Sequence, residues 1–199
     1  KELTIVDYNL EVLKDIVCNY KHSFSTFDGL KRKNSNINST SGIMLDFDAV
    51  AVLDADGIKT TKVDTTKTMT IDAFRRAYKD LRFFLYTSKS HQKVKYYPED
   101  HKKAGEIQIE ACDRFHVFIP FADVVELLTE KDRQQYKSVL RHVFTEVFPT
   151  SDQATKDPAR YFFPSPEDGT FIYNVGKTIL DYNAILDEVK KLEGDSDTL

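Results

Sequence analysis

A short apolar run, IMLDFD at residues 43–48, ends in two carboxylates that are separated by a single residue. In a β-strand, residues i and i+2 project from the same face, so Asp46 and Asp48 are predicted to lie side by side at the end of a buried strand. Two like charges at this spacing repel each other and raise the pKa of one carboxyl group unless a cation compensates them. The run therefore indicates a strand that ends in a cation site, and a divalent metal ion is the simplest occupant.

The size and charge of the chain limit what surrounds this strand. With 199 residues, 41% of them hydrophobic, the chain can bury one substantial core, so we expect a single domain over residues 1–199. We divide it into an N-terminal helix with a mobile basic loop (1–42), a core (43–175) and a C-terminal helix with a tail (176–199). The formal net charge of -4 excludes binding to nucleic acid through overall charge, so any such binding must come from local basic patches.

Cysteine content and hydropathy exclude several further classes. The chain has two cysteines, Cys18 and Cys112, which excludes a disulfide framework and a multi-cysteine zinc or iron–sulfur site. No apolar run approaches the roughly 20 residues that cross a bilayer, and the first residues lack the pattern of a signal peptide. We therefore expect a cytoplasmic, intracellular protein without a membrane partner.

Hydrophobic periodicity and turn residues divide the chain into alternating elements. Helices are predicted at about residues 8–20, 70–81, 131–147 and 181–192, and strands at about 43–48, 82–87, 115–121, 160–163 and 171–175. Pro120 is expected to stop its strand, the last two strands are expected to pair with each other, and residues 88–110 are expected to form a polar surface loop. This order predicts an α+β or two-layer α/β domain with a central mixed or antiparallel sheet flanked by helices.

Four motifs occur in order along the core. They are LDFD at 45–48, TSKSH at 87–91, RFHVFI at 114–119 and SDQATKDPARYFFP at 151–164. Together they resemble the catalytic core of the archaeo-eukaryotic primase superfamily, the primase-polymerases of many phages, plasmids and mobile elements. The resemblance implies an RRM-like catalytic core and a template-dependent nucleotidyltransferase, a DNA primase or DNA polymerase or both.

The same resemblance implies a metal site. Two Mg²⁺ or Mn²⁺ ions would be held by Asp46, Asp48 and a third acid from the last motif. That acid is either Asp152 or Asp157; we favour Asp152, because Asp157 precedes Pro158 and has the pattern of a turn or cap residue. Such ions can stabilise both the attacking and the leaving oxygens of phosphoryl transfer.

The resemblance also implies sites for the nucleotide and the template. The residues expected to bind the nucleoside triphosphate are Ser90, His91, Arg114, His116 and Arg160, with Arg114 at a position where the family often has serine. The basic residues expected to face a single-stranded DNA template are Lys31, Arg32, Lys33, Lys89, Lys93 and Lys95. Family members often carry a helicase or zinc-containing module after this core, and such a region would be a further partner. A chain encoded by a phage or plasmid would act in the host cytoplasm.

Two other functions remain open from the sequence. The run at 45–50 also resembles the nucleophile motif of haloacid-dehalogenase-type phosphohydrolases, in which the first aspartate attacks phosphorus and the second is a general acid. That family requires a downstream acidic pair after an apolar strand, which the sequence does not offer. The other alternative is a catalytically inactive module that only binds DNA in replication; the presence of both Asp46 and Asp48 argues against it.

Overall fold

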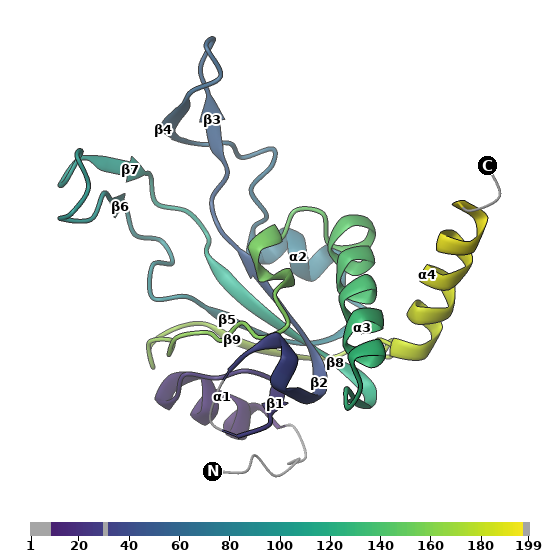
Figure 1. The fold of residues 1–199 in the computed structure, drawn as a ribbon. Helices are drawn as coiled ribbons and strands as arrows, with labels where there is room; N and C mark the ends of the chain where they lie inside the picture. The colour runs from purple at the N-terminus through teal and green to yellow at the C-terminus, as the bar shows by residue number, and fades with distance from the viewer. Residues whose placement is uncertain (1–8, 30–31, 197–199) are drawn as a thin grey trace.

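The strand that carries the paired aspartates lies inside a five-stranded antiparallel sheet (Figure 1). The computed structural model describes residues 9–29 and 32–196, and the strand order in the sheet is β1-β2-β8-β5-β9. The bounds are Ser25–Phe27 for β1, Ile37–Phe47 for β2, Arg82–Thr87 for β5, Phe115–Glu126 for β8 and Phe171–Val175 for β9. Each neighbouring pair is antiparallel, which confirms the predicted α+β class.

Helices cover parts of this sheet, and side chains cap several of them. The helices are α1 (Leu10–Asn19), α2 (Ile71–Ala77), α3 (Glu130–His142), which continues in a π-helical turn (Val143–Val147), and α4 (Tyr182–Ser196). Asn9 and Thr70 accept hydrogen bonds from backbone N–H groups at the starts of α1 and α2, and Thr129 forms a capping box with Asp132 at the start of α3. Within the described residues, no helix combines the length and apolarity needed to cross a membrane.

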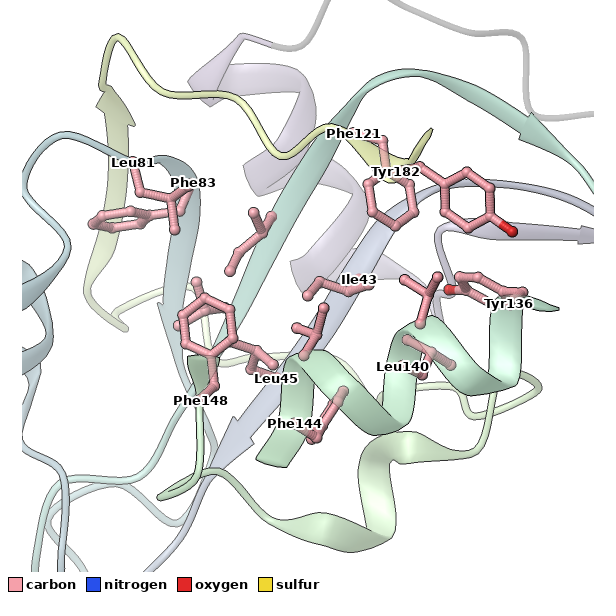
Figure 2. Close-up of a cluster of buried hydrophobic side chains, with 14 of the residues drawn as sticks. Ile43, Leu45, Leu81, Phe83, Phe121, Tyr136, Leu140, Phe144, Phe148 and Tyr182 are labelled. Atoms are coloured by element: carbon pink, nitrogen blue, oxygen red, sulfur yellow. The ribbon is translucent and has the colours of Figure 1, made fainter. Parts of the chain in front are cut away.

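The alternation of side chains along β2 decides which of them face the main core. Leu45 and Phe47 are buried in the main core, a hydrophobic cluster that lies between one face of the sheet and the helices α2 and α3 (Figure 2). Helix α4 also contributes side chains to this cluster. Met44 packs instead against the smaller cluster on the opposite face, where α1 contributes Leu13. Because the side-chain period is two, Asp46 shares the face of Met44 and points away from the main core.

Strand β2 begins at Ile37, six residues earlier than predicted, so the expectation of a mobile loop through residue 42 is wrong. The segment 21–42 contains β1 and a short 3-10 helix at Asn34–Asn36. Ile37 and Thr40 are buried within an otherwise polar run, and β2 pairs with both β1 and β8. Burial of these two side chains and pairing on both sides supply the stability that the polar composition alone does not indicate.

Strand β8 continues through Pro120 to Glu126, which corrects the prediction that the proline stops it. The register with β2 changes at this point, from Gly42↔Pro120 to Thr40↔Val125. A strand tolerates proline at such a register shift, because the regular ladder of hydrogen bonds is interrupted there and the N–H that proline lacks is not needed. Gly42 is also required here, since a Cβ at that position would lie 2.2 Å from the carbonyl oxygen of Ile119.

The predicted pairing of strands 160–163 and 171–175 is also wrong. Strand β9 pairs with β5, and of the earlier segment only Phe162 forms an isolated bridge, with His22. Two helix ends differ as well: α2 stops at Ala77, and α4 continues past Gly194, where a tail was expected. The residues of the 160–163 segment instead contribute to a cavity wall described below.

Two small hairpins extend from one end of the sheet (Figure 1). One consists of β3 (Ala51–Leu53) and β4 (Lys59–Val63), and the other of β6 (Lys95–Tyr96) and β7 (Ile107–Ile109). The backbone N–H of Glu110 donates to the carbonyl of Thr61 at 2.9 Å and so joins them. The predicted polar loop at 88–110 therefore includes a hairpin that leads away from β5 and returns to β8.

Buried His22 makes stability depend on pH. Its Nδ1 lies 3.0 Å from the carbonyl of Tyr20 and its Nε2 2.6 Å from the hydroxyl of Tyr86. Burial, aided by the nearby His116 and opposed by the bond to Tyr20, lowers the pKa of His22 to about 4. The histidine is neutral in the folded state, whereas in the unfolded state its pKa is near 6.5. As pH falls from 6.5 to 4, protons therefore bind the unfolded chain preferentially, which lowers the free energy of unfolding.

We expect this difference to cost up to about 3 kcal/mol of the free energy of unfolding between pH 7 and pH 4. Urea unfolding at pH 7, 5.5 and 4.5 measures it. The variant His22→Gln is expected to be less stable at pH 7 but to lose less stability over the same range. Parallel pH profiles for the two proteins would assign the acid sensitivity to other groups.

Candidate active site

Three side chains lie next to one another across the central strands. Asp46 on β2 is in register with His116 on β8, and His116 is in register with Tyr86 on β5. The Nε2 atom of His116 lies 3.3 Å from Oδ1 of Asp46, and its ring meets that of Tyr86 edge to face at 5.1 Å. The Nδ1 atom of His116 is buried and has no hydrogen-bond partner among the described residues. The sheet thus holds the Asp46–His116 pair in a fixed position.

Asp48, just beyond the end of β2, is bound by two cations. Its Oδ2 accepts from Nζ of Lys95 at 2.6 Å, and its Oδ1 accepts from Nε of Arg114 at 2.7 Å and from the backbone of Ala49 at 2.8 Å. Partial burial would raise the pKa of Asp48, but the bonds from Lys95 and Ala49 and the charges of Lys95 and Arg114 outweigh it and lower the pKa. Asp48 is therefore a carboxylate at neutral pH.

Arg114 is 1% exposed, and its guanidinium connects Asp48 with the β6–β7 hairpin. Besides Asp48, it donates to the carbonyl oxygens of Ser90 at 2.8 Å, Lys93 at 2.7 Å and Glu110 at 3.0 Å. These carbonyls lie on both sides of the hairpin. Arg114 was predicted to bind phosphate; the structure places its donors on Asp48 and the backbone, which favours a role in positioning Asp48.

Asp46 and Asp48 line a cavity of about 500 Å³. This volume lies within the range of roughly 300–1,000 Å³ that is usual for small-molecule sites. The charged residues in its wall are the acids Asp46, Asp48 and Asp157 and the bases Arg32, Lys89, Lys95, Arg114 and Arg160. Ser90 and His116 also line it, so the structure gathers members of all four motifs around one cavity.

The two candidates for the third acid occupy different places. Asp157 lines the cavity, and its Oδ1 accepts from the backbone N–H of Ala159 at 3.1 Å. Asp152 is not among the cavity-lining residues; its carboxylate accepts from Ala154 at 3.0 Å and caps the 3-10 helix Gln153–Lys156. Its backbone N–H donates to the carbonyl of Asp46 at 2.7 Å, so the backbones of the two residues lie side by side. The choice of Asp152 stays a prediction, and the geometry favours Asp157.

The remaining residues from the TSKSH motif differ in their access to the cavity. The hydroxyl of Ser90 lies 3.1 Å from that of Ser88, and both residues line the cavity, as does the exposed Lys89. His91 accepts from the backbone N–H of Arg114 at 3.2 Å through Nδ1 and lies outside the cavity lining. Lys93 is exposed and lies outside the cavity lining, and its carbonyl accepts from Arg114.

The predicted basic patch is split among several surroundings. Arg32 lines the cavity, where its Nη1 donates to the carbonyl of Ala159 at 2.6 Å and its guanidinium lies 4.1 Å from the ring centre of Tyr161. Lys33 is exposed and precedes the first 3-10 helix, whereas Lys31 lies outside the described residues. Lys95 also lines the cavity, where it is bound by Asp48, so three of the predicted template residues, Arg32, Lys89 and Lys95, share this cavity.

Sequence reasoning missed the aromatic part of the wall. Tyr161, Phe162 and Phe163 line the cavity, whereas the sequence predicts a strand over residues 160–163 and assigns these three no role in the site. An aromatic run is typical of buried strands, and only the flanking Pro158 and Pro164 indicated an irregular segment. Within the described residues, no three His, Cys, Asp or Glu side chains stand close enough together to form a ready-made metal centre.

No protein-family model, curated protein or solved structure matches the chain. Assignment of a function to the cavity therefore depends on the positions, charges and contacts of its own residues.

Proposed function

We propose that the chain is a template-dependent nucleotidyltransferase, a DNA primase or DNA polymerase or both, that joins nucleoside triphosphates on single-stranded DNA in the replication of a phage, plasmid or mobile element. The observation that carries the proposal is the cavity in which Asp46 and Asp48 meet five basic residues and His116. Carboxylates suit divalent cations, and basic side chains suit a triphosphate. One cavity that offers both fits a metal-bound nucleotide.

The donor chemistry of the cavity suits Mg²⁺ or Mn²⁺. Asp46, Asp48 and Asp157 offer hard oxygen ligands to the same cavity, Asp46 from β2 and Asp48 from the position just after this strand. Two ions held there would stabilise the charge that develops on the attacking oxygen and on the pyrophosphate leaving group.

The chain's own residues have separable roles in this proposal. Arg32, Lys89 and Arg160 supply positive charge to the cavity, and Lys89 and Arg160 would hold the phosphates by charge-assisted hydrogen bonds. His116 contacts Asp46 through Nε2 and would orient that carboxylate. Arg114 fixes Asp48 relative to the β6–β7 hairpin.

The contacts of Asp48 favour this proposal over a haloacid-dehalogenase-type phosphohydrolase. That mechanism requires the second aspartate of the run to give up a proton, and an effective general acid has a pKa near the working pH. Lys95 and Arg114 instead help to lower the pKa of Asp48. A carboxylate held in its charged form fits a metal ligand better than an acid catalyst.

One set of assays separates the three functions. The purified chain is incubated with labelled ribo- or deoxynucleotides, with primed or unprimed single-stranded DNA, and with Mn²⁺ or Mg²⁺, beside a phosphatase assay. Template-dependent incorporation is the expected result. Phosphatase activity without incorporation would replace the proposal with the phosphohydrolase, and DNA binding with neither activity would replace it with an inactive replication module.

Lys95 is expected to compete with a metal ion for Asp48. Its ammonium lies 2.6 Å from Oδ2, so an ion at that oxygen must displace it. Because both side chains are more than a third exposed, the pair contributes at most about 1 kcal/mol, and Lys95→Met should tighten Mn²⁺ binding by roughly 3- to 5-fold. Titration calorimetry measures the change. Lys93→Met, which alters an exposed lysine outside the cavity lining, is the matched control, and equal affinities in both variants would contradict the prediction.

A further inference from the structure

The aromatic wall of the cavity contains an exposed ring. Phe162 is buried and meets the ring of His116 edge to face at 4.8 Å, so it belongs to the support of the site. Phe163, one residue further, lines the cavity yet is 54% exposed. Its ring meets that of Tyr161 edge to face at 5.4 Å, which fixes the orientation of both. The cavity therefore presents a large apolar surface that no side chain fully covers.

Cations flank these two rings. Nζ of Lys21 lies 5.0 Å from the ring centre of Phe163 and 5.8 Å from that of Tyr161. Arg32 lies over Tyr161 at 4.1 Å and is held there by its bond to the carbonyl of Ala159. Cations over ring faces stabilise such an arrangement and give it a positive charge. An aromatic surface of this kind suits a flat, electron-rich ring that is attached to an anion.

We infer that Phe163, backed by Tyr161 and Arg32, is a stacking platform for the base of the incoming nucleoside triphosphate. The inference rests on the proposed function and adds to it a position for the base. Phosphates would meet the basic residues Lys89 and Arg160 of the same cavity, while the base would cover Phe163. The two chemical halves of a nucleotide thus match the two kinds of surface in the wall.

A stacking platform also suits an enzyme that selects nucleotides by pairing with a template. Stacking on an aromatic face accepts any base, because every base has a π-face, and leaves its hydrogen-bonding edge free. A template-directed enzyme must accept all four bases at this position and leave the choice to the template strand. Phe163 has no polar group that could read one base.

Paired ligands test the inference. Binding of a deoxynucleoside triphosphate and of inorganic tripolyphosphate, both with Mg²⁺, is measured by titration calorimetry for the wild type, Phe163→Ala and Phe163→Leu. We expect both variants to bind the nucleotide at least about 5-fold more weakly, and tripolyphosphate with unchanged affinity, because only the nucleotide has a base to stack. Leu192→Ala, which truncates a side chain on α4 that is 55% exposed, is the matched control and should alter neither affinity.

A second variant tests contact directly. The chain contains no tryptophan, so Phe163→Trp introduces a single fluorescent reporter that preserves the aromatic face. Nucleotide is expected to quench its emission and to bind with near wild-type affinity, whereas tripolyphosphate should leave the emission unchanged. This variant keeps the inference testable even if Phe163→Ala is unstable.

The outcomes separate the platform from the proposed function. Equal weakening of both ligands in Phe163→Ala, or unchanged nucleotide affinity, would overturn the platform while leaving a nucleotidyltransferase in place. Loss of single-stranded DNA binding without loss of nucleotide affinity would assign the ring to the template and would also overturn the inference. A wild type that binds neither nucleotide nor tripolyphosphate would overturn both the platform and the proposed function.

Discussion

Asp46→Asn is expected to lower nucleotide incorporation by about 1,000-fold or more while leaving the fold intact. The substitution removes a charged metal ligand, and loss of several kcal/mol of charge stabilisation in the transition state corresponds to this factor. Stability should change little, because among the described residues the side chain of Asp46 has one ionic contact, with His116 at 3.3 Å, and an amide fits the same space. Primer extension and thermal unfolding of the same preparation measure the two effects.

Asp48→Asn should be equally inactive but also less stable, by roughly 1–3 kcal/mol. Unlike Asp46, Asp48 compensates the buried Arg114, which would lose its charged partner. Asp123→Asn, on an exposed acid of β8 outside the cavity, is the control for loss of one negative charge. Near-normal nucleotide incorporation by Asp46→Asn or Asp48→Asn would contradict the proposal that both acids are metal ligands. Equal stabilities of the two variants would contradict the proposal that Asp48, unlike Asp46, stabilises the fold by compensating Arg114.

Local patterns in the sequence predicted the parts of the site that lie within single elements. The two-residue spacing in the LDFD run predicts that Asp46 and Asp48 face the same site, and both line one cavity, although Asp48 lies just beyond the end of β2. The apolar run around His116 likewise predicted its strand, and Thr70 its helix start. Each of these features needs only a few neighbouring residues, so each can be read without knowledge of the fold.

Contacts between distant segments could not be predicted in this way. The sequence indicated that the paired acids need a cation, but not that Lys95 and Arg114, 47 and 66 residues from Asp48, supply positive charge from the chain itself. The path of the backbone through Pro120 depends on the irregularity opposite Gly42. The aromatic run at 161–163 predicts a strand because β-strands and the walls of binding cavities are enriched in the same aromatic residues.

Asp48 is both a proposed metal ligand and the charged partner of Arg114, and this combination leads to a test of Arg114. Arg114→Lys is expected to destabilise the fold by roughly 2–4 kcal/mol and to weaken metal binding, although the charge is retained. A single ammonium cannot replace the guanidinium fork, which reaches Asp48 and three carbonyl oxygens on both sides of the β6–β7 hairpin. Urea unfolding and Mn²⁺ titration measure the two effects, and Lys89→Arg, at an exposed position of the same cavity, controls for exchange of one basic residue for the other.

The alternative role makes the opposite prediction. If Arg114 held the triphosphate, Arg114→Lys would chiefly raise the KM for nucleotide and leave both stability and metal affinity near the wild-type values. A double-mutant cycle with Asp48→Asn distinguishes the two roles further, because a residue that acts through Asp48 should lose most of its effect on metal affinity once Asp48 is neutral. Additive losses of metal affinity in the cycle would show that Arg114 acts independently of Asp48 and would contradict its role in positioning that carboxylate.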